Sequence, residues 1–169
     1  RHTEGEAKTV HVSLYDAAVC SLTNQASNYL MTKNSPERLG NLHPNIAPYG
    51  EIFKTKNDKQ ITFAIGSDRH FIDLSTTLKL EIMDDPHFAT NQLRVQNREK
   101  LETLIQQKVK HLNSDHLMNQ LHHLNVPCAL IKNINEVLDS NMSQYLIRSE
   151  IIDGEPTSRI TSIGFNWTD

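Results

Sequence analysis

The segment EIFKTKNDKQITFAIG, residues 51–66, predicts a β-hairpin. Two extended runs flank the polar residues 56–59, and a loop of this length is common between antiparallel strands. Apolar and polar residues alternate in the second run, which predicts one shared face for Ile61, Phe63 and Ile65. This part of the fold therefore begins with antiparallel β structure.

After the hairpin, the apolar residues take up the spacing of helices. Phe71, Leu74 and Leu78 lie at i, i+3 and i+7, and Asp68 can cap the helix that they predict. Residues 92–112 form the longest periodic stretch and predict one amphipathic helix. Its apolar stripe consists of Leu101, Leu104, Ile105, Val109 and Leu112.

Shorter signals predict further helix starts and a return to strand. Asp85–Pro86 is a typical helix entry, and Ser114 or Asp115 can cap a helix that contains Leu117, Leu121 and Leu124. Residues 133–136 resemble a capping box. Short strands are expected at 128–131, 148–152 and 158–165, the last two around the turn at Asp153–Gly154.

The N-terminal part predicts a strand at 9–13 and one helix at 14–31, because the second stretch contains no Gly or Pro. Residues 34–50 are dense in Gly, Pro and Asn and predict a long loop, which marks a boundary between two packing units. Taken in order, these elements predict an α+β fold.

Composition excludes several classes of protein. The 169 residues are 37% hydrophobic and 22% charged, with a formal net charge of −3. Such a chain has no basic stripe for nucleic acid and no apolar run of the roughly 20 residues that a membrane span needs, so we expect neither partner. Two widely spaced cysteines are typical of a reducing cytoplasm. The chain begins with Arg1 rather than Met, so we expect a removed leader or an internal piece of a longer protein.

Local patterns give little support for metal or nucleophilic chemistry. Nine histidines are present, but His111 and His116 are five residues apart and His122 and His123 are adjacent, whereas a helical metal pair needs i and i+4. We therefore expect no metal. The nucleophile-elbow and phosphate-loop motifs are absent from the sequence, and Cys20 and Cys128 are expected to be packed rather than reactive.

The loop RLGNLHPNIAPYG, residues 38–50, has the composition of a binding loop. Asn41, His43, Asn45 and Tyr49 can all donate hydrogen bonds to a ligand. The alternative is a plain connector that its prolines stiffen. Composition alone leaves both interpretations open.

At this loop the sequence resembles a known family. The strings VHVSLYDAA (10–18), RLGNLHPNIAPY (38–49) and FKT (53–55) resemble the family III CoA-transferases, the group of formyl-CoA transferase and carnitine CoA-transferase. The resemblance continues in order through IGSDRHF (65–71), DPHFATN (85–91), RVQNR (94–98) and VPC (126–128), and so covers nearly the whole chain.

The resemblance implies an enzyme that moves coenzyme A between carboxylic acids through an aspartyl-CoA intermediate, without metal or organic cofactor. The family's nucleophilic aspartate would precede Arg1, and neither Asp16 nor Asp68 matches it. We therefore expect no catalytic residue in this chain and no activity from the chain alone. The implied organisation is the end of the large domain (1–33), a lid or linker loop (34–47), the small α+β domain (48–150) and a return toward the large domain (151–169).

The resemblance also places residues 38–50 at a glycine-rich lid that closes over the aspartyl intermediates. The expected lid residues are Gly40, Asn41, His43, Pro44 and Tyr49, although His43-Pro44 stands where the family has a glycine run. Family members form interlocked homodimers, so we expect a cytoplasmic dimer in the full enzyme. Two alternatives stay open: an α-methylacyl-CoA racemase of the same family, and a non-catalytic interaction domain.

Overall fold

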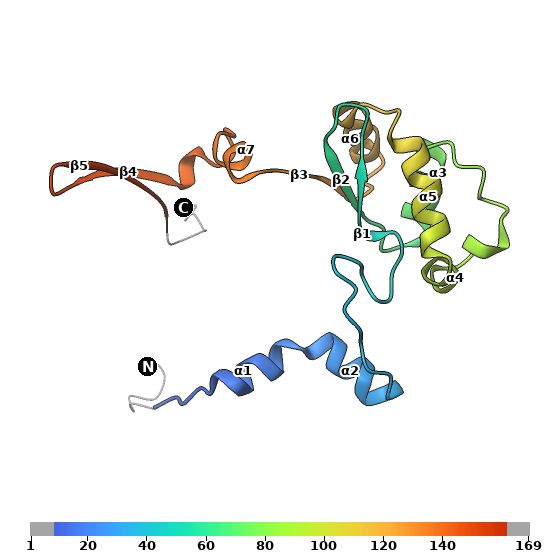
Figure 1. Cartoon of the computed structure of the whole chain (residues 1–169), viewed down its shortest axis with the longest axis horizontal. Helices are drawn as coiled ribbons and strands as arrows, with labels where there is room; N and C mark the ends of the chain where they lie inside the picture. Colours follow the sequence, from blue (N-terminus) through green and yellow to red (C-terminus); the bar gives the residue numbers. More distant parts are fainter. Residues whose placement is uncertain (1–8, 162–169) are drawn as a thin grey trace, which may run out of the picture. The chain divides into compact units, whose positions relative to one another are not determined.

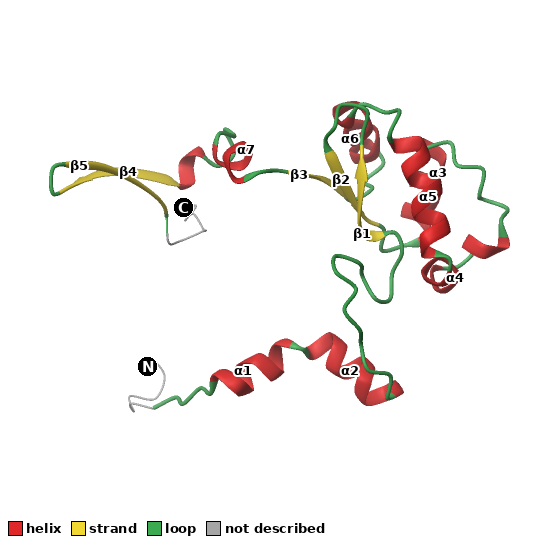
Figure 2. Cartoon of the chain, in the orientation of Figure 1, coloured by secondary structure: helices red, strands yellow, loops and turns green. Residues whose placement is uncertain are grey.

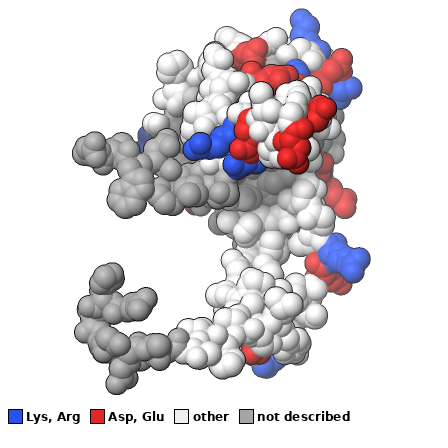
Figure 3. Space-filling model, turned by 90° about the vertical axis from the view of Figure 1, so that its left-hand side faces the viewer, with Lys and Arg blue, Asp and Glu red and all other residues white. Residues whose placement is uncertain are grey.

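The computed structural model describes residues 9–161, which belong to two compact units, residues 1–40 and 41–169 (Figure 1). The described part contains helices and two small antiparallel sheets, so the predicted α+β class is confirmed. None of its helices is both long enough and apolar enough to cross a lipid bilayer. Charged side chains of both signs are spread over the second unit (Figure 3), whereas residues 9–33 contain only Asp16 and Lys33.

The first unit consists of helices α1 (Leu14–Ser21) and α2 (Thr23–Thr32), separated at Leu22. The prediction of one continuous helix is therefore wrong at this residue. Ser21 and Thr23 flank the break, and their hydroxyls donate to the carbonyls of Ala18 and Cys20, in competition with regular helical bonding.

Two further expectations fail in the first unit. Residues 9–13 form no strand, because no strand of the described chain pairs with them and a strand needs such a partner. Cys20 is exposed rather than packed, since neither α1 nor α2 buries any residue.

The second unit begins with a three-stranded sheet of β1 (Tyr49–Lys54), β2 (Gln60–Ala64) and β3 (Cys128–Ile131), in the order β1-β2-β3 (Figure 2). The predicted hairpin is confirmed, and Phe53 pairs with Ile61 across it. Ile61, Phe63 and Ile65 are all buried, as their alternation predicts.

Five helical segments follow β2: α3 (Asp68–Thr77), the 3-10 turn η1 (Pro86–Phe88), α4 (Asn91–Gln96), α5 (Arg98–Val109) and α6 (Ser114–His123). They enclose one hydrophobic core with the sheet. The predicted stripe is confirmed, because Leu101, Ile105 and Val109 are fully buried and Leu104 and Leu112 pack against them.

Several helix boundaries differ from the prediction. The stretch 92–112 is two helices, because the backbone leaves the helical path at Asn97 (φ −106°, ψ 27°). Ser67 rather than Asp68 caps α3, and Asn113 rather than Ser114 or Asp115 caps α6, each through a side-chain oxygen that accepts backbone N–H bonds. Asp85 caps η1 as predicted.

The last described segments contribute nothing to the buried core. They are α7 (Ile134–Leu138), η2 (Gln144–Leu146), β4 (Ile147–Ile152) and β5 (Glu155–Ile160). The predicted capping box at Asn133 and Glu136 and the turn between β4 and β5 are confirmed. Residues 162–165, at the end of the last predicted strand, lie outside the described residues.

Replacing Ile105 with alanine should lower the free energy of unfolding by about 3 kcal/mol, because the side chain is 0% exposed and its loss leaves a cavity in the core. Urea titration followed by circular dichroism measures the change. Ile134→Ala is the matched control, since Ile134 is 80% exposed, and should change stability by less than about 0.5 kcal/mol. Equal effects of the two substitutions would contradict the assignment of the core.

The carboxylate of Asp85 predicts a pH dependence of stability. The backbone N–H of His87, then its ring and the ammonium of Lys100, lower the pKa of Asp85 from its usual 3.8 to about 2. Folding therefore favours the charged form, and the stabilisation that is present above pH 3.8 is lost as the pH falls toward 2.

Thermal unfolding of the Asp85→Asn variant should show this loss. The difference in melting temperature between wild type and variant should shrink as the pH falls through that window. Asp84→Asn is the control, because the Asp84 carboxylate has no hydrogen bond or ion pair within residues 9–161. A difference for Asp85→Asn that stays constant with pH would disprove the assigned cause.

Candidate functional site

The 41–50 loop is closed at its base by contacts between its two ends. The backbone N–H of His43 donates to the carbonyl of Tyr49 at 3.0 Å, and the side-chain amide of Asn41 donates to the carbonyl of Gly50. Gly50 has φ +95°, and a Cβ at this position would collide with the carbonyl oxygen of Asn41. The closure therefore requires glycine at position 50.

The middle of the loop is held by polar side chains of two helices. Asn91 and Arg94 of α4 and Arg98 of α5 all contact the loop backbone. The Asn91 amide donates to the carbonyl of Asn45 at 2.7 Å and accepts the N–H of Ala47 at 3.2 Å.

The side chain of Arg94 is 2% exposed, and all three nitrogens of its guanidinium donate hydrogen bonds. Its Nε donates to the carbonyl of Ala47 at 3.3 Å, and Nη1 donates to that of Phe88 at 3.2 Å. Nη2 pairs with Asp68 at 2.5 Å, and the group lies 4.3 Å from the centre of the Phe71 ring. Arg94 thus ties the loop to the start of α3.

Arg98 joins the loop to β1. Its Nη2 donates to the carbonyls of His43 at 2.5 Å and Ile46 at 3.0 Å. Its Nη1 pairs at 2.5 Å with Glu51, a carboxylate whose side chain is only 1% exposed. The other oxygen of Glu51 accepts the N–H of Tyr49 at 2.5 Å, so one buried ion pair fixes both the loop and the strand that follows it.

Among the expected lid residues, the structure brings Asn41, His43 and Tyr49 together. Nδ1 of His43 accepts the N–H of Asn45 at 3.1 Å, and the His43 and Tyr49 rings lie 5.0 Å apart at 55°. Pro44 is half-buried in the same loop. Gly40 has φ +63°, and a Cβ added there would meet no heavy atom within 4 Å, so its surroundings are open.

Sequence reasoning missed the residues that support the loop: Glu51, Asn91, Arg94 and Arg98. Arg94 and Arg98 stood in a string that resembles the family, but their partners in the loop are 47 to 55 residues away in the sequence. The available signal was the polar spacing i, i+3, i+7 of residues 91, 94 and 98, just before and within the helix predicted at 92–112, whose apolar stripe accounts for the core.

A hollow of about 340 Å³ lies beside the loop, between the ends of β1, β2 and β3. It is lined by Tyr49, Gly50, Thr62, Phe63, Ala64, Pro127, Cys128 and Ala129. Burial raises the pKa of the Cys128 thiol to about 11, so this side chain is protonated near neutral pH. The expectation that Cys128 is packed is confirmed.

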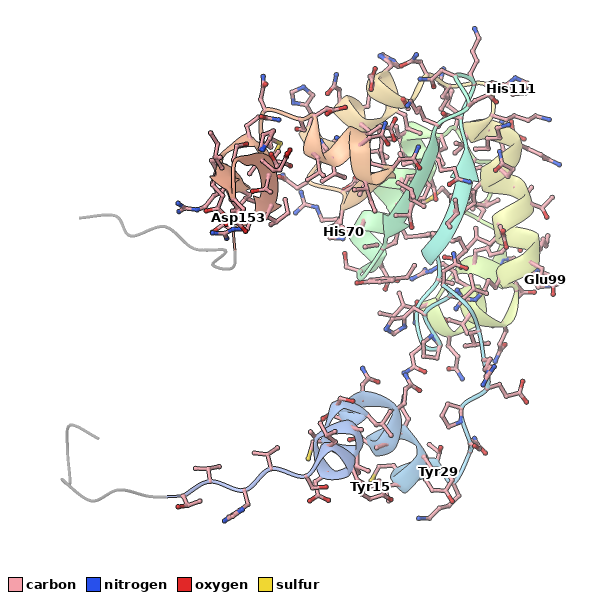
Figure 4. The ribbon with its side chains drawn as sticks, turned by 60° about the vertical axis from the view of Figure 1, so that its left-hand side comes forward. Tyr15, Tyr29, His70, Glu99, His111 and Asp153 are labelled. Carbon is pink, nitrogen blue, oxygen red and sulfur yellow. The ribbon has the colours of Figure 1, made fainter. Side chains whose placement is uncertain are left out.

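The described histidines are spread over several elements, and His116, His122 and His123 share α6. Figure 4 shows His70 on α3 and His111 just beyond the end of α5, well apart in the view. Within residues 9–161, no group of three or more His, Cys, Asp or Glu side chains is placed to hold a metal ion.

The chain is similar to known CoA-transferases. A family model described as CoA-transferase family III matches residues 1–164. Succinate–glutarate CoA-transferase of Agrobacterium fabrum is 34% identical over 134 residues, which are 79% of this chain and 33% of that protein. Succinyl-CoA–D-citramalate CoA-transferase of Chloroflexus aurantiacus is 26% identical over 90% of this chain and 37% of its own length. The chain thus spans about a third of the length of these curated relatives.

Solved structures share the fold. A CAIB/BAIF family protein from Brucella suis is 35% identical and superimposes with a TM-score of 0.70 over 93% of this chain and 41% of its own. A protein from M. tuberculosis, at 17% identity and a TM-score of 0.73, shows the same fold over 94% of this chain. These likenesses confirm the family expected from the sequence: the chain belongs to CoA-transferase family III.

Proposed function

We propose that the protein moves coenzyme A from an acyl-CoA thioester to a second carboxylic acid. The match to the family III model over residues 1–164 is the observation that carries this proposal. The named curated relatives are CoA-transferases, and the racemase alternative gains no support from them.

The acids that we propose are short dicarboxylates. Relatives named for succinate with glutarate, for succinyl-CoA with citramalate or mesaconate, and for oxalate all have a dicarboxylic acid in their names. These proteins come from different organisms and are 26 to 34% identical to this chain, which makes the shared substrate class a better guide than any single substrate.

The proposed reaction passes through a carboxylate nucleophile. An aspartate attacks the donor thioester and forms a mixed anhydride, with release of the CoA thiolate. The thiolate then attacks the aspartyl carbonyl, which frees the donor acid and leaves an aspartyl-CoA thioester. The acceptor carboxylate repeats these two steps in reverse, so the new acyl-CoA leaves and the aspartate is regenerated. No metal or organic cofactor takes part in this proposal.

We propose that the aspartate is supplied by a part of the protein outside this chain. The carboxylates nearest the loop are already engaged: Glu51 with Arg98, and Asp68 with Arg94. In this proposal the loop residues Gly40, Asn41, His43, Pro44 and Tyr49 border the acyl site and keep water from the anhydride and the thioester. The proposed setting is an interlocked homodimer in the cytoplasm, with free thiols at Cys20 and Cys128.

The full-length protein that contains this segment tests the function directly. Incubated with succinyl-CoA and glutarate, it should form glutaryl-CoA and free succinate, which mass spectrometry detects. The chain of residues 1–169 alone should form none. In deuterated water, exchange of the α-hydrogen of a branched acyl-CoA without CoA transfer would favour the racemase instead.

Gly50→Ala tests the role of the loop in that full-length protein. The added Cβ would collide with the backbone of Asn41, so the loop must move, and transfer should slow by about 10- to 100-fold. Gly66→Ala is the matched control, because nothing lies within 4 Å of its Cβ position, and should keep the wild-type rate. If the two variants had equal rates and equal melting temperatures, the proposal that the loop borders the active site would be wrong.

A further inference from the structure

Every polar group of His43 except one has a partner. Its N–H donates to the carbonyl of Tyr49, and its carbonyl accepts from Arg98 at 2.5 Å. Its Nδ1 accepts the N–H of Asn45 at 3.1 Å, and its ring packs against Tyr49. Nε2 is the one polar atom of His43 that has no hydrogen-bond partner within residues 9–161.

The contact with Asn45 determines where the ring proton lies. A backbone N–H can only donate, so Nδ1 must offer its lone pair and bear no proton. The proton of the neutral ring is then on Nε2, which makes His43 a hydrogen-bond donor on a fixed backbone. The same contact prevents Nδ1 from acting as a general base.

The two arginines that hold the 41–50 loop are not available for a ligand. Arg94 donates from Nε, Nη1 and Nη2 to protein oxygens, and Arg98 donates from both terminal nitrogens. A guanidinium engaged in this way cannot turn to an incoming carboxylate without leaving buried oxygens unpaired. The uncharged donors that the loop can offer to an anion are therefore Nε2–H of His43, the side-chain amide of Asn45 and the hydroxyl of Tyr49, and of these the ring of His43 is the one that a backbone N–H holds in place.

We propose that Nε2–H of His43 donates a hydrogen bond to the distal carboxylate of a dicarboxylic substrate and so determines specificity; this inference rests on the proposed function. The reacting carboxylate becomes an anhydride and then a thioester, whereas the distal carboxylate stays ionised throughout. His43 is held by three contacts that involve the backbone. A donor held in this way is suited to a carboxylate whose charge does not change during the reaction. A hydrogen bond to a charged acceptor is also stronger than one to a neutral carbonyl.

Nuclear magnetic resonance of the chain labelled with ¹⁵N-histidine tests the tautomer. The His43 signals are identified by their loss in His43→Asn. Nδ1 should show the shift of an unprotonated ring nitrogen, and Nε2 should show that of a protonated one. The opposite pattern, or averaging of the two nitrogens, would overturn the fixed-donor assignment without any bearing on CoA transfer.

Kinetics of the full-length protein test specificity, with glutarate and pentanoate as acceptors of equal length. His43→Asn retains a side-chain oxygen for the N–H of Asn45 but lacks a donor at the Nε2 position. It should lower kcat/KM for glutarate, mainly through KM, by about 10- to 100-fold more than it lowers kcat/KM for pentanoate. His43→Gln places an amide N–H near the Nε2 position and should restore most of the loss.

His123→Gln, on the exposed end of α6, is the control and should match wild type for both acceptors. Equal losses for glutarate and pentanoate in His43→Asn, at an unchanged melting temperature, would overturn the inference and leave the proposed function intact. Absence of CoA transfer by the wild type would overturn the proposed function and this inference together.

Discussion

The carboxylate of Glu51 is buried at the point where the loop becomes β1, and the arrangement of the loop, β1 and α5 depends on its neutralisation. An isolated charge in such a place costs several kcal/mol, and removal of its partner is strongly destabilising. Arg98 supplies the partner from the first position of α5, and the N–H of Tyr49 satisfies the second oxygen. One ion pair therefore fixes where the strand begins, where the helix begins and how the loop between Asn41 and Gly50 is folded.

Arg98, together with Asn91 and Arg94, explains how a loop rich in turn residues can be ordered. Buried carbonyls need donors, and a loop cannot supply them from a neighbouring strand. Here the carbonyls of His43, Asn45, Ile46 and Ala47 receive theirs from Asn91, Arg94 and Arg98. The α4–α5 segment thus has apolar side chains that pack into the core and polar side chains that bind the backbone of the loop. The two sides together join the loop to the folded unit.

Sequence alone predicted the parts of this unit that depend on local spacing. Alternation in 60–66 and the stripe from Leu101 to Val109 correctly identified the buried residues, because both periods follow from backbone geometry. Helix ends were less predictable, since Asn113 and Ser67 compete with adjacent residues that can also cap. The hydrogen bonds that hold the loop could not be predicted. They join side chains to backbone carbonyls about 45 to 55 positions away in the sequence, and a backbone carbonyl has no sequence signature.

This support changes what the proposed lid can do. A glycine-rich lid can move because glycine places few limits on the backbone. Opening of the 41–50 loop, in contrast, would break the hydrogen bonds that Asn91, Arg94 and Arg98 donate to it, at a net cost of about 0.5–1.5 kcal/mol each. Such openings are rare. Under the proposed function, the loop would therefore act as a fixed wall around the intermediates or would move together with α4 and α5. His43-Pro44 in place of a glycine run is consistent with that requirement, since proline limits the backbone and the carbonyl of His43 is the one that Arg98 holds at 2.5 Å.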